Sequence, residues 1–203
     1  MPSPPEVVED RIAMLEERLP HHAVCAEVGV FDGTFSRFIY EVTQPARLHL
    51  IDIWADISYE GEWCTNDGNA LKNLATVSTM FREPIKQGRV MLHQGRSAYL
   101  LSLFPDRYFD WVYVDADHSY QGVARDLLEA EAKIKPGGFL AGHDYATEEQ
   151  GANLRHYYPG VINAVNDFCQ KRGWKVICIS KQGEYSGEDI GGRHVPSYIL
   201  SRV

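Results

Sequence analysis

The segment 23–36, with the sequence AVCAEVGVFDGTFS, constrains the fold more than any other part of the chain. It opens as an apolar run that ends in Glu27, continues through Gly29 and Gly33, and then starts a new amphipathic run. This order predicts a buried strand, a tight turn and a helix start. Glycine permits positive φ and close approach of a ligand, and a helix start presents unpaired N–H groups. The segment therefore predicts a ligand-binding turn, although a strand and turn without a ligand would show the same pattern.

The acid at the end of this strand indicates the charge of the ligand. The spacing is ExGxxxG, whereas the pyrophosphate-binding turn of dinucleotide folds reads GxGxxG. Like charges repel at short range, so Glu27 favours a cationic ammonium group over an anion. A nicotinamide-dependent oxidoreductase, which would share the same kind of sheet, is therefore the weaker alternative.

Composition and charge exclude several classes of protein. The 203 residues suit one domain, and the net charge of −8 leaves no Lys/Arg excess for general nucleic-acid binding. Residues 1–11 lack the basic start and apolar core of a signal peptide, and no apolar run is long enough to span a bilayer. The four cysteines form no CxxC pair, which argues against a zinc knuckle. We expect a cytoplasmic protein that acts on a small molecule; the sequence leaves open whether it is a homo-oligomer.

Amphipathic segments alternate with short apolar runs along the rest of the chain. Helical spacing over residues 6–19 stops at Pro20, so we assign residues 1–20 to an N-terminal capping helix and residues 21–203 to the main domain. The expected strands are 23–28, 47–52, 89–93, 109–115, 139–142, 175–180 and 197–201, and the expected helices are 34–42, 69–81, 98–103, 121–133 and 161–171.

This alternation predicts an α/β fold with a doubly wound, mostly parallel, seven-stranded sheet. Lys135-Pro136-Gly137-Gly138 reads as a sharp turn before the fifth strand. The glycine-rich link before the last strand fits a hairpin better than a crossover helix, which predicts one antiparallel strand near the C-terminus. Ligands in such sheets bind at the carboxyl ends of the strands.

Acids recur at these carboxyl ends. Asp52 ends the second strand at the distance from the glycine turn where dinucleotide-type folds place a carboxylate on the ribose hydroxyls, so its two oxygens are expected to accept two hydroxyls. Asp is also a common turn residue, which is the alternative reading. Asp115 and Asp144 end or follow the fourth and fifth strands. Converging carboxylates repel, so they need a proton or a cation between them.

Five segments together carry a resemblance to a known family: AEVGVFDGTFS, LIDIW, VYVDADHSYQGVARDL, KPGGFLAGHDY and GVINAVNDF. They resemble the class I S-adenosylmethionine (SAM)-dependent methyltransferases, and in particular the small-molecule O-methyltransferase group that includes macrocin O-methyltransferase and the cephalosporin hydroxylase-associated proteins. The resemblance covers nearly all of the chain after Leu19. It implies the Rossmann-like methyltransferase sheet and SAM as cofactor. The cofactor-binding residues that it implies are Glu27, Gly29, Val30, Asp32, Gly33, Asp52, Ile53, Ser97, Asp115, Ala116 and His118.

The same resemblance implies a divalent metal in many relatives, held by acids at the ends of the fourth and fifth strands. The corresponding ligands here are Asp115, His143 and Asp144, and the ion would be Mg²⁺ or Mn²⁺. His143 departs from the acid-and-amide pair of catechol-type relatives, so it is either a third ligand or the general base. His118 is a second candidate base, and Asp115 completes the catalytic set. Without a metal, His143 and Asp144 would be a polar strand end.

The corner after the third strand is expected to contact adenine. Ser97 is predicted to be the N-cap of helix 98–103 and the adenine contact, because Arg96 stands where the family often has an acid. The irregular segment 53–68 is either a lid or a dimer contact. Aromatic residues available to enclose the acceptor are Trp54, Tyr59, Trp63, Tyr145 and Tyr157.

The predicted function is O-methylation of a hydroxyl on a sugar or small natural product. The alternative from another class is a SAM-binding protein that has lost catalysis, which the departure at His143 suggests. The sequence carries no code for the identity of the acceptor.

Overall fold

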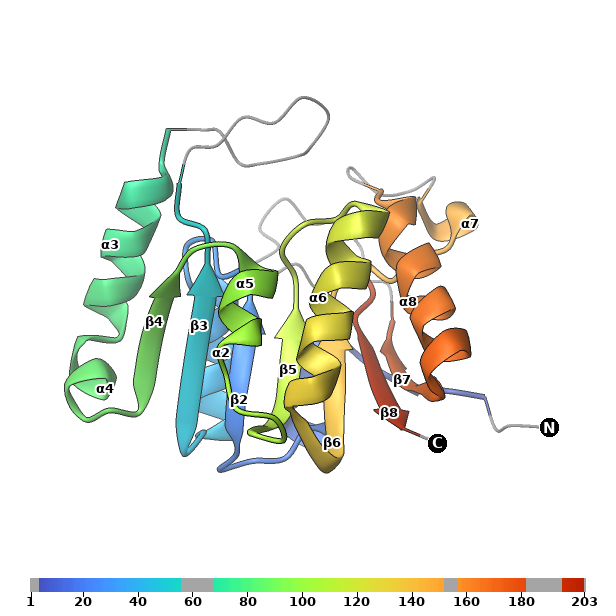
Figure 1. Ribbon diagram of the computed structural model, residues 1–203, viewed down its shortest axis with the longest axis horizontal. Coiled ribbons are helices and arrows are strands. Elements are labelled where there is room, and N and C mark those ends of the chain that lie inside the picture. The colour runs from blue at the N-terminus through green and yellow to red at the C-terminus, as the bar shows by residue number, and fades with distance from the viewer. Residues whose placement is uncertain (1–3, 56–67, 152–156, 182–194, 203) are drawn as a thin grey trace.

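The computed structural model describes residues 4–55, 68–151, 157–181 and 195–202. Within these ranges an eight-stranded sheet is covered by helices on both faces (Figure 1). The strands are β1 (Glu6–Val8), β2 (Val24–Val28), β3 (Arg47–Asp52), β4 (Val90–Gln94), β5 (Phe109–Val114), β6 (Ile134–Gly142), β7 (Trp174–Ser180) and β8 (Tyr198–Arg202). The helices are α1 (Arg11–Arg18), α2 (Thr34–Thr43), α3 (Ala70–Met80), α4 (Arg82–Lys86), α5 (Ser97–Ser102), α6 (Tyr120–Lys133), α7 (Glu148–Gly151) and α8 (Pro159–Arg172).

The strand order β1-β7-β8-β6-β5-β2-β3-β4 confirms a doubly wound, mostly parallel sheet. β8 pairs antiparallel with both β6 and β7, and every other pair is parallel. β2 lies between β3 and β5, so the chain winds in opposite directions on its two sides. Ligands in open α/β sheets bind at the carboxyl ends of the strands at such a switch point. The topology therefore points to the end of β2 as the binding edge.

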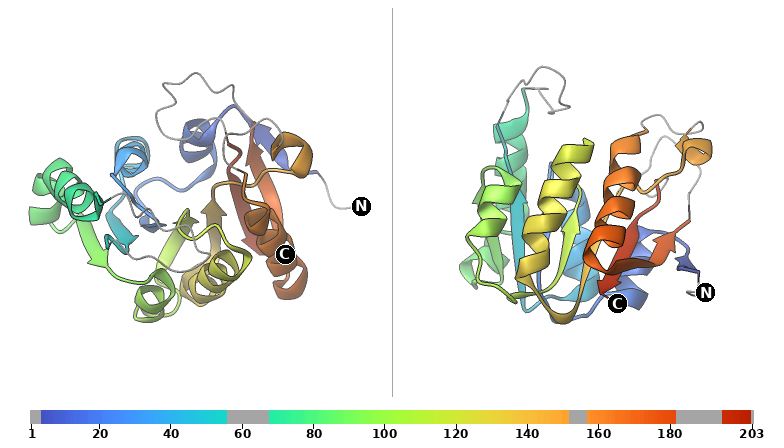
Figure 2. Two further views of the ribbon diagram at one scale, coloured as in Figure 1. Left: turned by 90° about the horizontal axis from the view of Figure 1, so that it is seen from above. Right: turned by 45° about the vertical axis from the view of Figure 1, so that its right-hand side comes forward.

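The helices form two layers, one on each face of the sheet. The view from above in Figure 2 shows α1, α2 and α3 on one side, and α5, α6 and α8 on the other. Two buried apolar clusters match these layers, one around Met14, Leu15 and Ile39, the other around Leu127 and Val165. In the chain between Pro4 and Arg202, as far as it is described, no helix has the length and apolar character needed to cross a bilayer.

The N-terminal segment differs from the single helix expected over residues 6–19. Asp10 accepts hydrogen bonds from the amides of Ile12 and Ala13, both at 2.8 Å, so α1 starts only at Arg11. The preceding residues Glu6–Val8 form β1, which pairs parallel with β7 at the edge of the sheet. The sheet therefore has eight strands instead of the predicted seven. α1 covers the sheet as expected, since Met14 and Leu15 lie in the same buried cluster as residues of β2.

Two local features of the second half of the chain bear on the predictions. The residues of the expected sharp turn, 135–138, fall within the bounds of β6, but the pairing with β5 jumps from Ile134–Phe109 to Phe139–Trp111 across them, and Gly137 has a φ of +79°. The strand is therefore irregular where the turn is predicted. Arg96, not Ser97, is the N-cap of α5, and Ser97 is the first helical residue. Most of the loop 53–68, with Tyr59 and Trp63, lies outside the described residues, as does most of the link before β8.

Candidate functional site

The turn after β2 has the backbone that its glycines predict. Gly29 has a φ of +92° and Gly33 a φ of +82°, both in the left-handed region. A Cβ atom at Gly29 would lie 1.9 Å from the main-chain oxygen of Asp115. The close approach that requires glycine here is therefore made by the main chain at the end of β5. This contact holds the turn directly against the next strand of the site.

Glu27, at the end of β2, is buried, and its carboxyl group is not exposed to solvent. Only 1% of the residue is exposed, and the Ser36 hydroxyl donates a hydrogen bond to its Oε2. Burial raises the pKa of Glu27 to about 8. The expectation of an ionised acid is thus corrected for the free protein, in which most of this carboxyl is protonated at pH 7. A cation that binds beside it would favour its ionised form.

Asp52 connects the turn after β2 to the end of β3. Its Oδ2 accepts the amides of Val30 and Phe31 at 2.8 and 2.9 Å, and its Oδ1 accepts the amide of Trp54 at 2.7 Å. A carboxylate has about four acceptor sites, so the bonds from the described residues leave one site on Oδ1. In this arrangement Asp52 can accept one of the two ribose hydroxyls that the sequence predicts it to bind.

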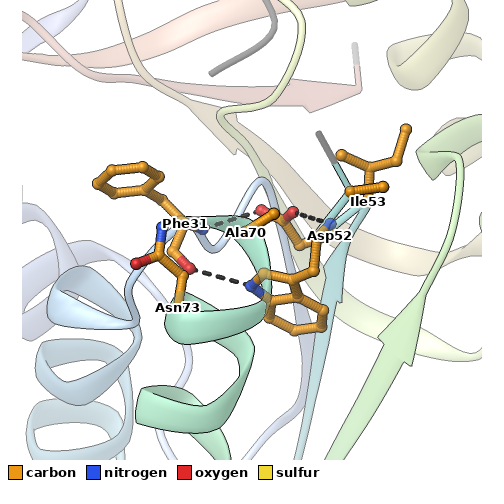
Figure 3. Close-up of a pocket in the computed structure, with 7 residues that line it drawn as sticks. Phe31, Asp52, Ile53, Ala70 and Asn73 are labelled. Carbon is orange, nitrogen blue, oxygen red and sulfur yellow. Dashed lines mark hydrogen bonds between the residues drawn. The ribbon is translucent and has the colours of Figure 1, made fainter. Parts of the chain in front are cut away.

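A small pocket lies beside Asp52, between the turn after β2, the residues that follow β3 and the start of α3 (Figure 3). Trp54 forms part of its lining, is 2% exposed, and donates from Nε1 to the Phe31 oxygen at 3.0 Å. Both residues have positive φ, 34° and 54°, and such strain clusters at functional sites. The residues that line the pocket are Phe31, Asp52, Ile53, Trp54, Ala55, Ala70 and Asn73.

Two further predicted cofactor residues serve local structure. Asp32 accepts the amide of Thr34 at 2.9 Å beside the start of α2. Ser97 donates to Oδ1 of the buried Asp126 at 2.7 Å, while Oδ2 of Asp126 is buried with no partner among the described residues. Burial raises the pKa of Asp126 to about 7. Sequence reasoning missed this acid, because its position on α6 reads as one polar residue among many.

A grouping of ionisable side chains lies where β5 and β6 end. His118 Nε2 is 2.9 Å from Asp144 Oδ2 and 3.5 Å from Asp115 Oδ1. His143 Nδ1 is 3.3 Å from Asp144 Oδ2 and 3.8 Å from Asp115 Oδ1. Asp144 has a φ of +60°, a conformation that is uncommon outside glycine. The predicted residues Asp115, His118, His143 and Asp144 are thus brought together.

The charges in this cluster stabilise one another. Burial opposes the imidazolium form of His118, but its bonds to Asp115 and Asp144 outweigh burial and raise its pKa to about 10. Burial likewise opposes the charged form of His143, yet the nearby Asp144 carboxylate raises its pKa above the usual range. Burial raises the pKa values of Asp115 and Asp144, but the neighbouring imidazoles outweigh burial, so both pKa values are lowered. Both histidines of the cluster therefore favour the protonated form in the free protein, and either one would have to lose its proton before it could act as the predicted base.

The donor set fits a divalent cation. One atom each of Asp115, His118 and Asp144 can be chosen so that all three lie within 4.8 Å of one another. Two carboxylates with one imidazole suit Mn²⁺ and also Mg²⁺. His118 takes the third place in this group, where the sequence favoured His143. Binding would require the imidazole to lose its proton.

One aromatic side chain stacks on a member of the cluster. The Tyr158 ring stacks on His118 with centroids 4.3 Å apart and an angle of 13° between the planes. Tyr145 donates to Asn166 Oδ1 at 2.7 Å. Tyr157 lies against Gly151 of α7. Tyr158 is not among the aromatic residues that the sequence predicts to enclose the acceptor.

Arg11 is a further residue that sequence reasoning missed. It is 4% exposed, and its Nη2 lies 3.7 Å from Asp115 Oδ2. The guanidinium carbon is 3.3 Å from the centroid of the Phe35 ring, a cation–π contact. An arginine in the first turn of an amphipathic helix usually reads as solvent-exposed, so only its neighbours in space identify it.

A family described as a methyltransferase domain matches residues 26–145, more than half of the chain. The chain belongs to this family. The matched span includes both glycines of the turn, Asp52 and all four members of the acid–histidine cluster. The methyltransferase domain thus contains the site that the geometry assembles.

Solved structures share the fold of this methyltransferase. The O-methyltransferase TomG from Streptomyces achromogenes, involved in tomaymycin synthesis and solved with SAM, has a TM-score of 0.61 at 17% identity, over 90% of this chain and 74% of that one. The O-methyltransferase from Bacillus cereus in complex with SAH (S-adenosylhomocysteine) has a TM-score of 0.60 at 13% identity, over 89% and 75%. The tRNA methyltransferase TrmK from B. subtilis has a TM-score of 0.61 at 11% identity, over 97% and 67%. No curated protein matches the chain.

Proposed function

We propose that this methyltransferase transfers a methyl group from SAM to a hydroxyl of a sugar or small natural product, with the assistance of a divalent cation. The observation that carries the proposal is the Asp115–His118–Asp144 cluster beside the turn after β2. The main-chain contact between Gly29 and Asp115 brings the predicted cofactor turn against the predicted catalytic acid. Holding the two reactants side by side can supply several kcal/mol of a transfer reaction.

The residues present fit the cofactor as well as the metal. Glu27 is a buried acid that can balance the ammonium group, and Asp52 has one remaining acceptor site for a ribose hydroxyl. The O-methyltransferases of similar fold were solved with SAM or SAH. These observations support SAM over a dinucleotide.

The acid cluster would hold Mg²⁺ or Mn²⁺ through Asp115, His118 and Asp144. When bound there, the ion would lower the pKa of an acceptor hydroxyl. His143 lies outside this three-donor group, 3.3 Å from Asp144, and in its neutral form it would accept the proton of the acceptor hydroxyl. The stacked pair of His118 and Tyr158 would cover one side of the acceptor and limit the access of water.

The test combines binding with methyl transfer. Calorimetry should detect SAH binding, and radiolabelled SAM should methylate members of a panel of sugars and catechols with Mg²⁺ or Mn²⁺. Asp144→Asn should abolish transfer but leave SAH binding within about threefold, whereas Asp167→Asn, at a partly exposed position on α8, should leave both unchanged. Absence of SAH binding would refute the proposal as a whole. Full activity in EDTA, with no effect of Mn²⁺ on thermal stability, would refute only the metal.

A further inference from the structure

Arg11 is a buried cation whose hydrogen-bonding capacity is not used by the described part of the protein. Its Nε is buried and has no hydrogen-bond partner among the described residues. The distance of 3.7 Å to Asp115 is an ion pair, but it is too long for a hydrogen bond. A buried polar group without a partner is costly and is normally satisfied by protein, water or a ligand. The position therefore points to an acceptor that these residues do not supply.

The surroundings of Arg11 indicate what that acceptor is. The guanidinium packs against the Phe35 ring, two residues after Gly33 of the turn. A guanidinium on an aromatic face keeps its N–H donors at its rim, in the fork arrangement that matches a carboxylate. Glu27 and Asp115 interact electrostatically with Arg11, so acid and base face the same small region. Such a pair of opposite charges complements a zwitterion, with an ammonium near the acids and a carboxylate near the arginine.

We propose that Arg11 binds the α-carboxylate of the methionine portion of SAM. This inference rests on the proposed function, because it takes SAM as the ligand of the turn after β2. It makes α1 a part of the cofactor site, beyond its role as a cover for the sheet. It also explains why a charged residue is buried in the first turn of this helix.

The test compares three ligands by calorimetry on the full chain. SAH carries the α-carboxylate, decarboxylated SAH lacks only that group, and 5′-methylthioadenosine lacks the whole amino acid portion. Arg11→Met should weaken SAH binding by about tenfold to a hundredfold, as expected for a charged hydrogen bond. It should leave the affinities for the other two ligands within about twofold. Arg18→Met, at a partly exposed position on the same helix, should change none of the three.

Each result decides between defined alternatives. Equal losses for all three ligands would show that Arg11 only supports the fold, and unchanged SAH affinity would show that the carboxylate binds elsewhere. Either result overturns the inference and leaves the proposed function standing. If the wild-type protein binds none of the three ligands, the proposed function fails and the inference fails with it. Retained binding of 5′-methylthioadenosine by Arg11→Met is also the evidence that the variant is folded.

Discussion

Replacement of Glu27 by glutamine should stabilise the free protein at neutral pH. Burial raises the pKa of Glu27 from 4.5 to about 8, so the folded chain holds a proton that the unfolded chain has released. Stability from this group is fully present below pH 4.5 and is lost as the pH rises toward 8. The free energy of unfolding of the wild type is thereby lowered by about 1 kcal/mol at pH 5 and by about 3 kcal/mol at pH 7, relative to its value at low pH. Glu27→Gln removes this cost, because an amide does not ionise.

The assay is urea unfolding at pH 5, 6 and 7, followed by circular dichroism. The advantage of Glu27→Gln over the wild type should grow with pH by about 2 kcal/mol across this range. Glu131→Gln is the matched control, because Glu131 is buried and pairs with Arg172 at 2.7 Å. It should be less stable than the wild type throughout. A constant difference between Glu27→Gln and the wild type would refute the reasoning.

The same carboxyl gives a second readout on cofactor binding. If an ammonium group binds beside Glu27, the carboxyl ionises, and SAH binding at pH 7 should release about one proton. Calorimetry in buffers of different ionisation enthalpy measures this number. Glu27→Gln should release none and should bind SAH more weakly, by about 1–3 kcal/mol.

Three further changes test the geometry around the site. Gly29→Ala should cost about 2–5 kcal/mol of stability, because the added Cβ would meet main-chain atoms of Asp115 at positive φ. Gly88→Ala also has positive φ but an open surrounding, so it should cost about 1–2 kcal/mol. Equal losses in urea unfolding would contradict the close approach of Gly29 to Asp115. Asp52→Ala should cost about 2–4 kcal/mol, because three amides lose their acceptor, and a loss under about 1 kcal/mol would contradict this. Burial lowers the pKa of His49 to about 3, so the stability that the neutral imidazole contributes is complete above pH 6.5 and decreases as the pH falls. The free energy of unfolding of the wild type, relative to that of His49→Gln, should therefore decrease by about 1 kcal/mol between pH 8 and pH 5.5. An increase over this range would refute the sign.

The sheet could be predicted because apolar runs and their end points are local signals. The run that ends at Asp52 coincides with β3, and the order of strands and helices follows from alternation. In parallel strands the carboxyl ends share one edge, so the gathering of Asp115 and Asp144 with the turn after β2 could also be predicted. β1 could not be predicted, since its three residues beside a helix are too few to show a periodicity of their own.

Contacts between distant segments explain the remaining misses. Arg11 belongs to the site only because α1 packs against α2, and Asp126 because α6 lies beside α5. The protonation of Glu27 follows from its burial, which a sequence motif does not display. The exchange of His143 for His118 in the three-donor group depends on side-chain directions after β5 and β6.

The contact between Gly29 and the main-chain oxygen of Asp115 has a consequence for engineering the enzyme. The proposed cofactor turn and the proposed catalytic acid are in direct main-chain contact, so we expect a shift of either turn to displace the other. Libraries that seek new acceptors for the proposed reaction should therefore keep both turns fixed and vary Tyr145 and Tyr157, which the sequence predicts to enclose the acceptor and which lie outside both turns. Variation at the coupled turns would change donor and acceptor alignment together.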